Sequence, residues 1–292
     1  MQKATKMNNN NLKIKETFIS ALQNHQKNNF EIAESLYKEI LKVNPKHFES
    51  VFYLGSLLVQ TKNFDKAKQL LQKAIQINPH FAVAYNNLGI TFIELGEDKK
   101  AMSHFQKAIQ IKPDFENAHY NIGVAFDKLN EFQKAVGCYE KAIQINPNYA
   151  AAYINLGNSS KELGKYKKTI DCYKKAIEIQ PNFVAAYNNL GIIFNELGEH
   201  KKAKSCFQKA IQINPNYAAA YNNLGKILGE LNHVNEAKKY FEKSLNLEPN
   251  NKNACEGYGD ILLKLNQHSK GLNYIRKGTS FIRFTPDDCK II

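Results

Sequence analysis

A 34-residue period constrains this chain more than any other feature of its sequence. Prolines keep that spacing along most of the chain without a change of register, and glycines keep it ten residues further on. The prolines are Pro45, Pro79, Pro113, Pro147, Pro181, Pro215 and Pro249. The glycines are Gly55, Gly89, Gly123, Gly157, Gly191, Gly225 and Gly259. A period of this length predicts a stack of similar supersecondary units, each contacting only its neighbours.

Each unit is predicted to be a pair of helices. In residues 82–115, Tyr85, Leu88 and Phe92 recur at spacings of three and four, which is one face of an α-helix. A second amphipathic stretch follows and ends before Pro113, because proline cannot donate the next helical hydrogen bond. The chain is therefore expected to be all-α.

A tight turn is expected between the two helices of each unit. Seven units place Gly or Asn at the turn position, and both residues tolerate the left-handed conformation that ends a helix. The remaining unit, residues 48–81, has Lys62 there, and we expect the neighbouring Asn63 to supply the turn instead.

Small and aromatic residues predict how the helices pack. The recurring glycine lies inside a helix, where it costs about 1 kcal/mol relative to alanine, so it needs a packing role. We expect it to let the second helix approach closely, against a matching alanine of that helix. An aromatic residue two positions after each proline is expected to fill the joint between units. This aromatic row comprises Phe81, Phe115, Tyr149, Phe183 and Tyr217.

The order Tyr-x-x-Leu-Gly-x-x-Phe, Ala-x-x-x-Phe-x-x-Ala, Pro resembles the tetratricopeptide repeat (TPR). The segment from Pro215 to Gly225 is similar to the repeat arm of O-linked N-acetylglucosamine transferases, here without a catalytic domain. The resemblance implies a right-handed superhelical α-solenoid of about eight repeats that acts as a non-catalytic scaffold for protein–protein interaction.

Domain boundaries follow from the period. Residues 1–13 form a polar N-terminal extension, residues 14–279 the solenoid, and residues 280–292 a tail outside the period. The units begin near residues 14, 48, 82, 116, 150, 184, 218 and 252. Within the tail, the alternation in residues 281–284 fits either a short strand or an adhesive segment, which would cover the end of the last unit or dock another molecule.

Catalysis finds no support in the sequence. It lacks the short motifs of metalloproteases, nucleotide-binding loops and serine hydrolases, and its histidines are scattered over different repeat positions. We expect no catalytic residues, no metal and no cofactor. The N-terminus has no apolar signal region, and no apolar run is long enough for a membrane span, so we expect a cytoplasmic protein.

The net charge of +13 leaves other partners open. Lysine supplies 38 of the 40 basic residues, whereas arginine, which contacts phosphate and guanine in bidentate fashion, supplies 2. Nucleic acid is therefore an unlikely partner, although a lysine-rich convex surface that binds nucleic acid or another polyanion remains an alternative, as does end-to-end self-assembly. One row of the second helices is basic: Lys66, Lys100, Lys134, Lys168 and Lys202.

An asparagine series is the candidate binding site. Five successive units carry Asn two residues before the periodic glycine, on a helix face that the family resemblance places in the concave groove. A side-chain amide both donates and accepts hydrogen bonds, so a ladder of amides would hold an extended peptide by its backbone. The simpler alternative is that this Asn-rich chain merely tolerates Asn at an exposed position. The ladder is Asn87, Asn121, Asn155, Asn189 and Asn223. Further contacts to the peptide are expected from Asn86, Asn188, Asn222, Ile90, Val124 and Ile192.

A second binding mode known in the family is disfavoured. A clamp for a C-terminal carboxylate needs several basic residues together in the groove, and here Lys226 is the one lysine at a comparable position.

Overall fold

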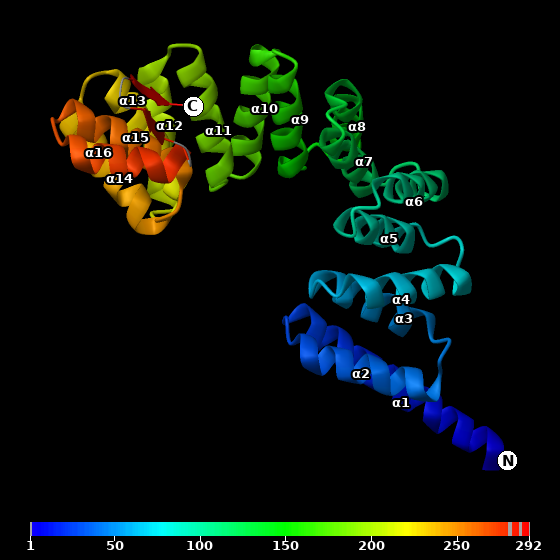
Figure 1. Cartoon of the computed structure of the whole chain (residues 1–292). Coiled ribbons are helices and arrows are strands. Elements are labelled where there is room, and N and C mark those ends of the chain that lie inside the picture. Colours follow the sequence, from blue (N-terminus) through cyan, green and yellow to red (C-terminus); the bar gives the residue numbers. More distant parts are fainter. Residues whose placement is uncertain (1, 280–281, 286–287, 292) are drawn as a thin grey trace. The chain divides into compact units, whose positions relative to one another are not determined.

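The computed structural model describes residues 2–279, 282–285 and 288–291, which hold sixteen helices and two strands (Figure 1). The helices form antiparallel pairs, as the repeat predicts, and the all-α solenoid is confirmed. The chain divides into two compact units, Met1–Asn148 and Tyr149–Ile292, with the division at a repeat boundary.

The first unit contains four helical hairpins. Each first helix packs against its own second helix, and each second helix packs against the first helix of the next hairpin. The helices are α1 (Gln2–Gln26), α2 (Phe30–Val43), α3 (Phe48–Gln60), α4 (Phe64–Ile77), α5 (Ala82–Glu94), α6 (Asp98–Ile111), α7 (Glu116–Lys128) and α8 (Phe132–Ile145).

The second unit repeats this arrangement with four more hairpins and adds a two-stranded antiparallel sheet. Its helices are α9 (Ala150–Glu162), α10 (Tyr166–Ile179), α11 (Val184–Glu196), α12 (His200–Ile213), α13 (Ala218–Glu230), α14 (Val234–Leu247), α15 (Lys252–Lys264) and α16 (His268–Thr279). Strands β1 (Ile282–Thr285) and β2 (Asp288–Ile291) pair with Ile282 opposite Ile291, so the alternating tail does form a short strand.

The turns inside the hairpins are left-handed, as predicted. Gly96, Gly164 and Gly198 have φ of 69–74°, and the asparagines at the turn position have φ near 60°. The expectation for the remaining turn was wrong. Lys62 itself adopts φ of 59°, while Asn63 has φ of −92° and begins α4 as its N-cap. The turn geometry is therefore fixed by the hairpin rather than by the residue that occupies it.

The periodic glycines make room for a ring rather than for an alanine. A Cβ atom placed on Gly157 would lie 2.5 Å from the ring of Tyr173, and one on Gly191 would lie 2.6 Å from the ring of Phe207. Both rings belong to the second helix of the same hairpin and are almost fully buried. Five of the seven periodic glycines thus form a recess that an aromatic side chain of the same hairpin fills, whereas Gly55 faces Leu71 and Gly259 faces Ile275. These large side chains replace the expected glycine–alanine contact.

The aromatic row after the prolines lies in the joints between hairpins, as predicted. Phe81 contacts Phe48 and Phe52 edge to face, with ring centroids 5.1 Å and 4.9 Å apart, and Phe115 is 6% exposed. Such contacts add to area burial and fix the angle between neighbouring hairpins.

The polar N-terminal extension is helical. Helix α1 begins at Gln2, so it runs through most of residues 1–13, and its first turns extend beyond α2 (Figure 1). No glycine or proline occurs in residues 2–13 to end the helix.

Candidate functional site

The five ladder asparagines lie on the first helices of successive hairpins, α5, α7, α9, α11 and α13, and all are half-buried. We call the surface around them the amide face. Its neighbours Ile90, Val124 and Ile192 are also half-buried, and Ile90 and Ile192 pack against the cores of their units. The amide face is therefore a mixed polar and aliphatic surface on each unit.

In the first unit, hydrogen bonds connect the amides of neighbouring repeats. Asn87 Nδ2 donates to Ser56 Oγ at 2.9 Å, and Asn121 Nδ2 donates to Asn86 Oδ1 at 2.9 Å. Within α5, Asn86 Nδ2 donates to Asn87 Oδ1 at 3.4 Å. These bonds join α3, α5 and α7 through their polar side chains.

The second unit has the same arrangement. Asn189 Nδ2 donates to Asn158 Oδ1 at 3.2 Å, Asn223 Nδ2 donates to Asn188 Oδ1 at 2.9 Å, and Asn188 Nδ2 donates to Asn189 Oδ1 at 3.5 Å. The hydroxyl of Tyr173 donates to the same Asn158 oxygen at 2.6 Å. Both units thus use the ladder position to bond the preceding repeat.

Burial separates the predicted site residues into two groups. Asn86 and Asn188 are only 5% exposed, so their amides have little surface to offer a peptide, and their direct contact with a ligand stays a prediction. Their oxygens instead accept bonds from Asn121 and Asn223 and so orient those ladder amides. Asn222, at the equivalent position on α13, is half-buried.

The internal bonds leave hydrogen-bonding capacity on the ladder. An asparagine amide has two N–H donors and two acceptor lone pairs. Asn223 donates once to Asn188 and accepts once from Asn222, at 2.9 Å and 3.4 Å. One N–H and one lone pair of an oriented amide therefore remain.

Hollows lie beside two of the ladder residues in the second unit. Asn189 lines one of about 130 Å³ together with Asn158, Tyr173 and Ile192. Asn223 lines a larger one of about 460 Å³, which also contains Asn222 and Lys226. The amide face is therefore hollowed where the ladder passes.

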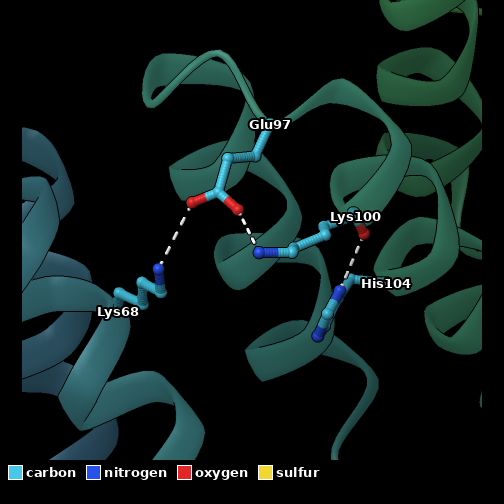
Figure 2. Close-up of polar contacts among 4 residues, drawn as sticks. All are labelled: Lys68, Glu97, Lys100 and His104. Atoms are coloured by element: carbon cyan, nitrogen blue, oxygen red, sulfur yellow. Dashed lines mark hydrogen bonds and ion pairs between the residues drawn. The ribbon is translucent and has the colours of Figure 1, made fainter.

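The basic row on the second helices is largely paired within the chain. Figure 2 shows Glu97 between Lys68 of α4, whose Nζ lies 3.3 Å from Glu97 Oε1, and Lys100 of α6. The hydrogen bond from Lys100, together with that from Lys68, lowers the pKa of the Glu97 carboxyl. The Lys100 ammonium also lies over the Phe92 ring, 5.6 Å from its centroid.

The same pairing recurs along the row. Lys134 pairs with Glu131 and lies over Phe126, and Lys202 pairs with Glu199. A charge already matched by a carboxylate and an aromatic face has less attraction for an external polyanion.

The cysteines of the helices are unsuited to nucleophilic chemistry. Burial raises the pKa of the Cys138 and Cys206 thiols to about 11. Since the thiolate is the reactive form, both remain protonated at neutral pH.

Comparison with known sequences identifies the repeat. Tetratricopeptide repeat patterns match residues 25–88, 116–149, 150–183, 184–217 and 218–251, and a further TPR repeat pattern matches residues 89–130. The chain belongs to the tetratricopeptide repeat family. TPR proteins are generally non-catalytic scaffolds that bind other proteins, and the present chain is a TPR-type scaffold. A search among curated proteins finds no match.

Solved TPR structures share the fold. MamA is 28% identical, with a TM-score of 0.51 over 56% of this chain and 96% of MamA. YrrB, described as a TPR protein with an unusual peptide-binding site, is 22% identical, with a TM-score of 0.52 over 63% of this chain and 95% of YrrB. PilF of Pseudomonas aeruginosa is 19% identical, with a TM-score of 0.65 over 74% of this chain and 97% of PilF.

Two absences hold for the described residues 2–279, 282–285 and 288–291. None of helices α1–α16 combines the length and the apolar character that crossing a membrane requires. Within the same part of the chain, no three or more His, Cys, Asp and Glu side chains gather in a group able to hold a metal ion.

Proposed function

We propose that this TPR protein is a scaffold that holds an extended segment of a partner protein along its amide face. The ladder asparagines contact the main chain of the peptide, while the aliphatic residues beside them contact its side chains. The observation that carries the proposal is the state of Asn223, which is fixed by two bonds within the chain and keeps one N–H and one lone pair.

The chemistry of the amide suits a peptide main chain. An extended peptide presents N–H and C=O groups alternately, and an amide can bond either of them whatever the side chain is. Fixing the amides in advance reduces the entropy that binding would otherwise cost. The solved YrrB structure carries a peptide-binding site by its description, so this fold is able to hold one.

The same proposal places the protein in the cytoplasm with a protein or peptide as its partner. The helices contain the free thiols Cys138, Cys172, Cys206 and Cys255, which is usual in a reducing compartment. The pairing of the basic row disfavours nucleic acid as the partner.

The test compares two double variants of the full chain. Peptides selected from a random displayed library serve as the probe, and their affinity is measured by fluorescence anisotropy. Asn189→Ala with Asn223→Ala removes two ladder amides and is expected to weaken binding about 5- to 150-fold, since each bond contributes about 0.5–1.5 kcal/mol. Asn182→Ala with Asn216→Ala is the matched control, because both residues are exposed and follow a proline in a linker.

A second probe tests recognition of the main chain itself. The selected peptides are resynthesised with N-methyl groups on alternate residues, which removes N–H donors and keeps the side chains. Binding is expected to fall to the level of the ladder variant. Equal affinities for the ladder variant, the linker variant and the unaltered protein would refute the proposal.

A further inference from the structure

The junction between α13 and α15 lacks a hydrogen bond that occurs at two inner junctions. Asn86 Oδ1 accepts from Asn121, and Asn188 Oδ1 accepts from Asn223, in each case from the amide 35 residues further along. The residue 35 positions after Asn222 is Gly257, which has no side chain. The Oδ1 atom of Asn222 is buried and has no hydrogen-bond partner among residues 2–279, 282–285 and 288–291.

The nitrogen of the Asn222 amide sets the orientation of that amide. Its Nδ2 donates to Asn223 Oδ1 at 3.4 Å, so turning the amide over would bring two oxygens together. A buried acceptor left unpaired costs about 1–3 kcal/mol, which a suitable donor would recover. The oxygen therefore selects an N–H donor as its partner.

The chain itself cannot close this junction at position 257. A Cβ atom placed on Gly257 would lie 2.5 Å from the ring of Phe241, which occupies the space that a ladder side chain would need. The donor must therefore enter through the cavity of about 460 Å³ between α13 and α15. Its lining residues are Asn222, Asn223, Lys226, Phe241, Asn253, Glu256, Gly257 and Asp260.

Carboxylates outnumber cations in this cavity. Glu256 and Asp260 are exposed, and neither takes part in an ion pair within the described residues. Lys226 is the one lysine in the lining, and the nearby Lys264 donates its Nζ to the carbonyl oxygen of Gly229 at 3.1 Å. The cavity thus offers two carboxylates and an unpaired amide oxygen on a chain whose net charge is +13.

We propose that this cavity is a subsite for a basic side chain of the bound peptide, with arginine as its best occupant. The planar guanidinium has five N–H donors, so it can donate to Asn222 Oδ1 while it pairs with Asp260 and Glu256. Lys226 reduces the negative charge of the cavity without cancelling it. The inference rests on the proposed peptide-binding function and adds a side-chain preference to it.

The subsite can be tested without knowing the natural partner. The probes are N-acetyl-arginine methylamide and N-acetyl-citrulline methylamide, which have nearly the same shape but differ in charge. Each is titrated into the ¹⁵N-labelled full chain, and the backbone amide of Gly257 is followed by NMR. The dissociation constant obtained from this signal is expected to be at least about 5-fold lower for the arginine probe than for the citrulline probe. The reason is that charge-assisted hydrogen bonds are about twice as strong as neutral ones.

Substitutions in the cavity lining test whether the preference for arginine over citrulline arises there. Asp260→Asn with Glu256→Gln should reduce the arginine affinity to that of citrulline, whereas the control Asp171→Asn, an exposed aspartate of α10, should leave it unchanged. Asn222→Leu should weaken both probes, because citrulline also donates N–H groups. Equal binding of both probes to the unaltered protein, or an unchanged preference in the Asp260 and Glu256 variant, would overturn the inference.

The outcomes also separate the subsite from the ladder. A library peptide that loses affinity in the Asn189 and Asn223 variant but shows no preference for arginine supports the proposed function and refutes the subsite. The opposite outcome is that the Asn189 and Asn223 variant binds every peptide as tightly as the unaltered protein and still prefers arginine. That outcome refutes the proposed function and leaves a binding site for a cation.

Discussion

The junction between α11 and α13 and the junction between α13 and α15 are built from the same repeat positions, yet one is closed and the other open. In the inner junction, Asn223 Nδ2 donates to Asn188 Oδ1 and satisfies that buried acceptor. In the outer one, Asn222 faces a glycine, and a cavity with two carboxylates takes the place of the amide pair. The comparison teaches that periodic residues build the scaffold, while a departure from the period creates a distinct site. The predictions below test this contrast.

The largest expected difference concerns stability. Asn188→Ala removes the acceptor of Asn223 and leaves a space in a buried position, so it should lower the free energy of unfolding by about 1–3 kcal/mol. Asn222→Ala removes an oxygen that has no partner and one long bond, so it should cost less than about 1 kcal/mol. Urea unfolding of both variants measures the difference. Equal losses would mean that the two junctions are energetically alike.

The glycine recess of the α11–α12 hairpin should be more tightly filled than that of the α13–α14 hairpin. A Cβ atom on Gly191 would lie 2.6 Å from the Phe207 ring, whereas one on Gly225 would lie 3.0 Å from the Phe241 ring. Overpacking costs about 1–3 kcal/mol, and replacing a mid-helix glycine by alanine recovers about 1 kcal/mol. Gly191→Ala is therefore expected to destabilise by about 1 kcal/mol, and Gly225→Ala to be nearly neutral in the same urea experiment. A larger loss for Gly225→Ala would contradict this account.

The open junction should also respond to pH. Partial desolvation by the surrounding residues, followed by the neighbouring Glu256 carboxylate, raises the pKa of the solvent-exposed Asp260 above its ordinary 3.8. A raised pKa in the folded protein means that Asp260 gains its proton at a higher pH than an unperturbed aspartate. Binding of the arginine probe should be lost as pH falls through that pKa, and Asp260→Asn should remove this step. NMR titrations between pH 3 and 7 measure it, and a profile that is identical in the variant would exclude Asp260 as the titrating group.

The smallest expected change in stability concerns Lys62, a turn residue of the first unit that is neither glycine nor asparagine. Lys62 adopts the left-handed conformation that Gly198 adopts in an equivalent turn, with φ of 59° and 73°. Because glycine takes this conformation without a steric penalty, Lys62→Gly should raise stability by about 0.5–1 kcal/mol. The matched change Lys46→Gly in an exposed linker should not. A destabilised Lys62→Gly variant would show that the lysine side chain stabilises the turn by contacts of its own.

Sequence reasoning succeeded where local rules decide the outcome. The proline period set the ends of the second helices, and the Gly or Asn at each turn set a left-handed conformation. It failed at Lys62, because the hairpin imposes the conformation even on a residue that disfavours it. It also named alanine as the partner of the periodic glycines, because the contact with rings such as Phe207 depends on side-chain direction rather than on spacing.

The candidate site was predictable only in outline. The ladder series was visible in the sequence, but the burial of Asn86 and Asn188 was not, since it depends on how closely neighbouring first helices approach. The cavity at the last junction was missed as well. Its signal was present in the sequence: Gly257 interrupts the asparagine series, and Asp260 stands where Val124 and Ile192 occur in other repeats.

The filling of each glycine recess by a large side chain of the same hairpin bears on how such a chain could lengthen. A duplicated segment of 34 residues carries both the recess and the side chain that fills it, so copying or deleting a whole repeat leaves no void inside the hairpin. Selection can therefore change the number of repeats in the array without redesigning its interior.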